Sequence, residues 1–150
     1  MSMQKVPTGI VLGIAVTAIV ISVLATSLLS NYQRITNNGN VEAVGVGVYW
    51  DNHCTDNVTS IDWGFLEPGA VTNRTVYIKN SGNVPAMLNM TTADWSPNEA
   101  YGNITLSWNR EGYLLDSGLV VQMVLTLSVS SEIAGVASFS FDIIITGTEL

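Results

Sequence analysis

VQMVLTLSV at residues 121–129 and SFSFDIII at residues 138–145 alternate large apolar side chains with mostly polar ones. Because successive side chains of a β-strand point to opposite faces, a period of two indicates a strand with one buried and one solvated face. The pattern places Phe139 and Phe141 in a core and leaves Ser138 and Ser140 in solvent. Both stretches therefore predict antiparallel β-sheet in the C-terminal part of the chain.

Five shorter segments upstream alternate in the same way, and turns rich in Gly, Pro and Asn separate them. Their apolar positions are Val44, Val46, Val48 and Trp50; Ile61, Trp63 and Phe65; Val76 and Ile78; Ala86, Leu88 and Met90; and Ile104, Leu106 and Trp108. About seven such strands predict an all-β fold, an immunoglobulin-like or jelly-roll β-sandwich, over residues 41–150. The predicted core contains Ile61, Trp63, Val76, Ile78, Leu88, Leu106, Trp108, Leu125, Leu127, Phe139, Phe141 and Ile143.

The N-terminal part differs sharply, because residues 8–30, TGIVLGIAVTAIVISVLATSLLS, contain no charged side chain. A helix of about 20 apolar residues is long enough to cross a bilayer. We therefore expect one helix near Pro7–Leu29, so that residues 1–30 are a membrane anchor or a signal helix. Three outcomes stay open: a retained anchor, cleavage after the small residues of Ala25–Ser27, and pilin-like processing before the helix.

Residues 31–40, NYQRITNNGN, are polar and predict a flexible tether between the helix and the sandwich. This order predicts a cell-membrane protein with an extracellular C-terminal domain, or a secreted or cell-surface protein if the helix is cleaved. The membrane, through the N-terminal helix, is thus a predicted partner.

The exported part is acidic, since all twelve acidic residues lie from Glu42 onward together with three of the five basic ones. Nucleic-acid binding requires clustered Lys and Arg side chains to contact phosphates, so nucleic acid is excluded as a partner.

Residues for catalysis or metal binding are scarce. His53 is the only histidine and Cys54 the only cysteine, which excludes an intrachain disulfide and a zinc site built from this chain's own His and Cys residues. The sequence has no Gly-rich phosphate loop and no HExxH motif. We therefore predict no enzymatic activity, no metal and no cofactor.

Four Asn-x-Thr sequons follow the tether, at Asn57, Asn73, Asn89 and Asn103. N-glycosylation requires an exported protein and an exposed asparagine. Asn89 and Asn103 alternate with apolar strand residues and are therefore expected to point outward. The four sequons predict a glycoprotein.

The segment of Val44, Val46, Val48 and Trp50 has an unusual composition, because Gly45 and Gly47 occupy its other face. Glycine inside a strand marks close approach of another backbone. Two interpretations stay open: an ordinary first strand of its own sandwich, or a strand that enters the groove of a neighbouring subunit. The four apolar residues are our candidates for such strand exchange.

Two stretches, IDWGFLEPG at residues 61–69 and RTVYIKNSGN at residues 74–83, form a strand, Leu-x-Pro-Gly, a second strand and Lys-Asn-x-Gly. This pattern resembles camelysin and TasA-type secreted fibre proteins and their archaeal relatives, the bundling pilins. The resemblance implies an N-terminal hydrophobic segment, one jelly-roll or immunoglobulin-like domain, and assembly by passing an N-terminal strand to the next subunit.

Together these features predict a structural subunit of an extracellular filament or cell-surface assembly, joined by donor-strand exchange. The sequons favour an archaeal-type surface protein. The alternative is a single-pass membrane-anchored β-sandwich that serves as a binding or accessory module of the cell envelope.

Overall fold

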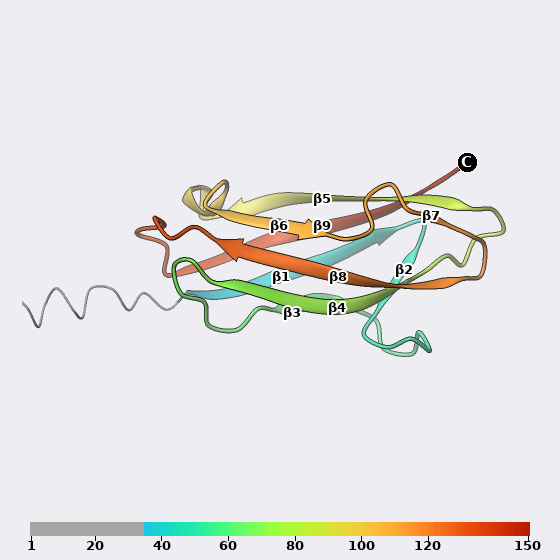
Figure 1. Ribbon diagram of the computed structural model, residues 1–150, viewed down its shortest axis with the longest axis horizontal. Helices are drawn as coiled ribbons and strands as arrows, with labels where there is room; N and C mark the ends of the chain where they lie inside the picture. The colour runs from blue at the N-terminus through green and yellow to red at the C-terminus, as the bar shows by residue number, and fades with distance from the viewer. Residues whose placement is uncertain (1–34) are drawn as a thin grey trace, which may run out of the picture. The chain divides into compact units, whose positions relative to one another are not determined.

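The computed structural model describes residues 35–150, which are all-β apart from one short 3-10 helix (Figure 1). The predicted helix at Pro7–Leu29 and residues 31–34 of the predicted tether lie outside the described residues. The elements are β1 Thr36–Val44, β2 Gly47–Tyr49, β3 Ser60–Asp62, β4 Val71–Lys79, β5 Ala86–Ser96, η1 Asn98–Ala100, β6 Ile104–Trp108, β7 Leu114–Leu115, β8 Val120–Val129 and β9 Ser138–Glu149.

The strands form two sheets, one of five strands in the order β3-β1-β9-β5-β7 and one of four in the order β2-β4-β8-β6. All strand pairs are antiparallel except β1 and β9, which run in the same direction (Figure 1). Buried apolar side chains from both sheets form one core cluster. The described part is therefore a two-layer β-sandwich.

The alternation in β8 and β9 produces this core. Phe139 and Phe141 are buried while Ser138 and Ser140 are exposed, so the predicted register is confirmed. Ten of the twelve predicted core residues are buried, and the other two, Leu106 and Trp108, are only partly buried. Both lie on β6, which pairs with β8 alone and forms the edge of its sheet.

The beginning of the sandwich differs from the prediction. Residues 36–40 were expected in a flexible tether, but they form the first half of β1, so the domain starts before residue 41. Residues 35–150 contain nine strands rather than about seven. The tether prediction is wrong there because pairing with strands on both sides, rather than apolar side chains, holds this polar stretch in the sheet.

The alternation expected at Ile61, Trp63 and Phe65 also breaks. Ile61 and Trp63 are buried, whereas the Phe65 side chain is 68% exposed. Gly64 between them has φ +76°, a left-handed conformation that turns the chain away from the strand direction. Phe65 therefore leaves the inner face on which the two preceding apolar residues lie.

Candidate functional site

The first strand of the sandwich, β1, lies in the interior of its sheet between β3 and β9 (Figure 1). It pairs in parallel with β9 over nine positions, from Thr36 opposite Ser138 to Val44 opposite Thr146. On its other edge it pairs with all three residues of β3, and the Ile35 N–H donates to the Leu66 carbonyl (3.0 Å). Main-chain hydrogen bonds therefore hold β1 on both sides.

The inner face of β1 contributes few apolar atoms to the core. Its residues there include Asn37, Gly39 and Val41, opposite Phe139, Phe141 and Ile143 of β9. A Cβ atom added at Gly39 would lie 3.2 Å from Trp63 Nε1 and 3.3 Å from Ile143 Cδ1. Side chains from β9 and from Trp63 thus fill the space above Gly39, and β1 leaves room for them.

Trp63 Nε1 is buried and has no hydrogen-bond partner among the described residues. The indole packs against β1 at Gly39.

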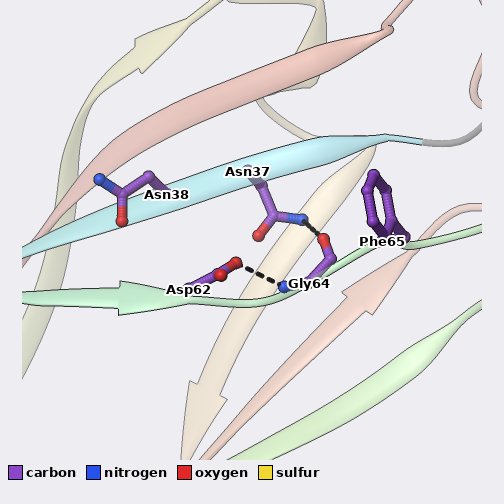
Figure 2. Close-up of a pocket in the computed structure, with 5 residues that line it drawn as sticks. All are labelled: Asn37, Asn38, Asp62, Gly64 and Phe65. Atoms are coloured by element: carbon purple, nitrogen blue, oxygen red, sulfur yellow. Dashed lines mark hydrogen bonds between the residues drawn. The ribbon is translucent and has the colours of Figure 1, made fainter.

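Asn37 connects β1 to the chain beyond β3 with its side chain. The Trp63 backbone N–H donates to Asn37 Oδ1 (3.1 Å), and Asn37 Nδ2 donates to the Gly64 carbonyl (3.3 Å; Figure 2). Asn37 is only 9% exposed. Its carboxamide continues the pairing after β3 ends at Asp62, and both groups of the amide have partners, as burial requires.

A hollow of about 400 Å³ opens beside this part of β1. Asn37, Asn38, Asp62, Gly64 and Phe65 line it (Figure 2). Further along β1, Asn40 Nδ2 donates to Asp142 Oδ1 of β9 (3.1 Å). The side chains of Asn38 and Asn40 are therefore exposed on the outer face of β1, whereas the side chain of Asn37 bonds to main-chain groups on the inner face.

The predicted exchange strand of Val44, Val46, Val48 and Trp50 is wrong as a single element. β1 ends at Val44, which is 57% exposed, and Val48 is buried in β2, opposite Ile78 in the other sheet. Gly45, with φ +76°, forms the tight connection, and a Cβ atom there would collide with the Gly147 carbonyl.

The other two candidates also lie outside β1. Val46 follows the Gly45 turn and packs against Gly147, where an added Cβ would lie 2.5 Å from Val46 Cγ1. The half-buried Trp50 follows β2, and its backbone N–H donates to the Asp56 carbonyl (2.8 Å). The spacing of apolar residues could not locate β1, because its inner face carries Asn37 and Gly39.

The four sequon asparagines are all exposed. Asn73 lies in β4 and Asn89 in β5, each on the outer face of its sheet, because the residues that alternate with the sequon include the buried Val76 and Leu88. Asn57 follows the loop after β2, and Asn103 precedes β6. The sequons are therefore distributed over both layers and two loops.

Asp51 lies in the loop at residues 51–56, and its pKa is lowered. Desolvation raises the pKa of Asp51, but hydrogen bonds that its carboxylate accepts from Asp56 N–H, Thr55 N–H and Oγ1, and His53 N–H outweigh it and lower the pKa overall. Over residues 35–150 there is no group of three or more His, Cys, Asp or Glu placed to hold a metal ion.

Within that same range, no helix has the length and apolar character needed to cross a membrane. No protein-family profile and no curated protein matches the chain.

Proposed function

We propose that this protein is a structural subunit of an extracellular filament or another cell-surface assembly, joined when β1 of one subunit enters the sandwich of another. The observation that carries the proposal is the position of β1, an N-terminal and largely polar strand inserted in the middle of a sheet. A polar strand remains soluble when released, and it binds through main-chain hydrogen bonds that any copy of the domain offers equally.

Removal of β1 would leave a groove lined by Trp63, Phe141 and Ile143. β3 forms the far side of this groove, and a side chain of the second sheet holds it there. Arg74 of β4 donates from Nε and Nη2 to the Asp62 carbonyl (3.1 and 2.9 Å). The Arg74 guanidinium also lies 5.7 Å from the centre of the Trp63 ring. β3 is thus attached to the second sheet without β1, which supports a groove that persists until another β1 fills it.

The sequence features complete the proposal. The apolar residues 8–30 direct the chain to the membrane as a helix that is retained or cleaved, and the immunoglobulin-like or jelly-roll sandwich is extracellular. The resemblance to camelysin, TasA-type fibre proteins and bundling pilins supports donor-strand assembly of an archaeal-type glycoprotein. The donor is β1, Thr36–Val44, in place of the strand first expected at residues 41–50.

The hinge of the exchange is short, because only Gly45 and Val46 separate β1 from β2. When β1 leaves its own sandwich, neighbouring subunits must therefore meet at the ends where β1 stops. Reciprocal exchange between two subunits gives a closed dimer, whereas exchange passed from one subunit to the next gives a filament.

A disulfide trap tests the exchange. The Val41 N–H donates to the Thr59 carbonyl (2.9 Å), so the adjacent pair Asn40 and Ser60 is not hydrogen-bonded. Cα atoms of such a pair are about 4.5 Å apart, within the separation that a disulfide spans. Two full-length chains are made on a Cys54→Ser background, one with Asn40→Cys and one with Ser60→Cys, then assembled together and oxidised.

Exchange predicts a disulfide-linked dimer on non-reducing gels from the mixture, and filaments by electron microscopy. Each single-cysteine chain oxidised alone is the control for non-specific linkage. A third chain carries both cysteines. If its disulfide forms only within one chain, and the mixture of the two single-cysteine chains stays unlinked, the proposal is contradicted and the membrane-anchored module is favoured.

A further inference from the structure

Of the four sequons, Asn103 lies in a distinctive local structure, the tight turn between η1 and β6. The Asn103 N–H donates to the Ala100 carbonyl (3.2 Å). Tyr101 has φ −63° and ψ 127°, and Gly102 has φ +84°, the angles of the two central residues of a type II turn. The turn places an aromatic residue two positions before the sequon asparagine.

The Tyr101 side chain is 70% exposed, and it packs against one neighbouring aromatic ring. Its ring meets the Trp95 ring edge to face, with centroids 6.2 Å apart. Trp95 in turn stacks on the buried Phe141, with centroids 4.2 Å apart and an interplanar angle of 4°. An aromatic ring with one packed edge is thus presented to solvent beside the sequon.

The Asn103 side chain is also positioned. Its Nδ2 donates one hydrogen to the Glu99 carbonyl (2.8 Å), which leaves the second N–H for modification. Thr105, the hydroxyl residue of the sequon, lines a hollow of about 270 Å³ together with Trp95, Tyr101 and Gly102. The residues around the sequon therefore form a shallow surface with an aromatic ring on it.

We propose that Asn103 carries an N-linked glycan whose first sugar lies against the exposed face of Tyr101 and stabilises the turn. The donor is a lipid-linked oligosaccharide: the C1–O bond to its phosphate breaks, the C1–Nδ2 bond forms, and Nδ2 loses one proton. The C–H groups of a pyranose carry partial positive charge and match the negative face of an aromatic ring. The residues two positions before Asn57, Asn73 and Asn89 are Thr55, Val71 and Met87, so those sequons have no such ring.

The test uses the full chain made in eukaryotic cells that attach high-mannose N-glycans, trimmed enzymatically to one N-acetylglucosamine. Mass spectrometry of peptides establishes occupancy at Asn103. The thermal midpoint is then compared between the parent and Asn103→Gln, each with Tyr101 and with Tyr101→Ala. We expect the sugar to raise the midpoint by about 3 °C in the parent, and by less than about 1 °C with Tyr101→Ala.

Two controls make the result specific. Tyr101→Phe should keep the shift, because it retains the ring and removes only the hydroxyl group. Asn89→Gln should change the midpoint equally with Tyr101 and with Tyr101→Ala. An unmodified Asn103 beside an occupied Asn89, or a sugar effect that survives Tyr101→Ala, would overturn the proposal. These readouts do not depend on polymerisation, so they stand apart from the filament hypothesis.

Discussion

Asn37 is the residue that most directly fixes β1, because its amide satisfies two main-chain groups beyond the end of β3. We expect Asn37→Ala to lower the free energy of unfolding by about 1–3 kcal/mol, since the backbone N–H of Trp63 loses its acceptor in a buried site. Urea denaturation measures the change. Asn38→Ala is the matched control on the exposed face of the same strand and should stay within about 0.5 kcal/mol of the parent. Equal effects of both substitutions would contradict the role of Asn37.

Asp51 gives the 51–56 loop a dependence on pH. Its pKa is lowered in the folded chain, so the stabilisation of the loop is complete above the pKa of the unfolded chain, near 4, and is lost as the pH falls through the lower folded value. NMR titration of the Thr55 and Asp56 amide hydrogens should report a midpoint below the ordinary pKa of an aspartate side chain. Asp51→Asn should abolish that titration, and a midpoint at or above the ordinary value in the parent would contradict the lowered pKa.

Among the elements, the connection between β1 and β2 determines how readily β1 can exchange. Gly45→Ala should shift the population from monomer to exchanged oligomer, because the added Cβ collides with the Gly147 carbonyl in the tight turn of the monomer, and opening this turn on exchange relieves the collision. Size-exclusion chromatography with light scattering measures the shift. Gly118→Ala is the control, since Gly118 also has positive φ (+73°) but has no atom within 4 Å of an added Cβ. Oligomerisation that is unchanged in Gly45→Ala, or increased equally in both variants, would count against a hinge at Gly45.

For the molecule as a whole, the exposed sequons on both layers predict extensive glycosylation. Intact-mass analysis of the protein from its own cells should show at least two N-glycans among Asn57, Asn73, Asn89 and Asn103. Enzymatic or chemical deglycosylation should return the mass of the polypeptide. An unmodified native mass would leave four ordinary surface asparagines.

The two long C-terminal strands, β8 and β9, were predictable because one face of each is apolar. In β8 and β9 each buried residue is flanked by polar or partly exposed ones, and this local period was sufficient to assign both the strand and its inner face. The exposure of Asn89 and Asn103 was predictable for the same reason, because both alternate with apolar residues that were expected in the core.

The position of β1 could not be predicted in this way. The pairing of β1 depends on partner residues about 25 and 100 positions away in β3 and β9. It also depends on the missing side chain at Gly39, which leaves space for Trp63 and Ile143. A glycine and an asparagine on an inner face resemble a loop when only near neighbours are considered. In the folded domain Gly39 leaves space for the side chains of Trp63 and Ile143, and Asn37 bonds to main-chain groups of Trp63 and Gly64. Long-range packing therefore determines the strand on which the proposed assembly depends.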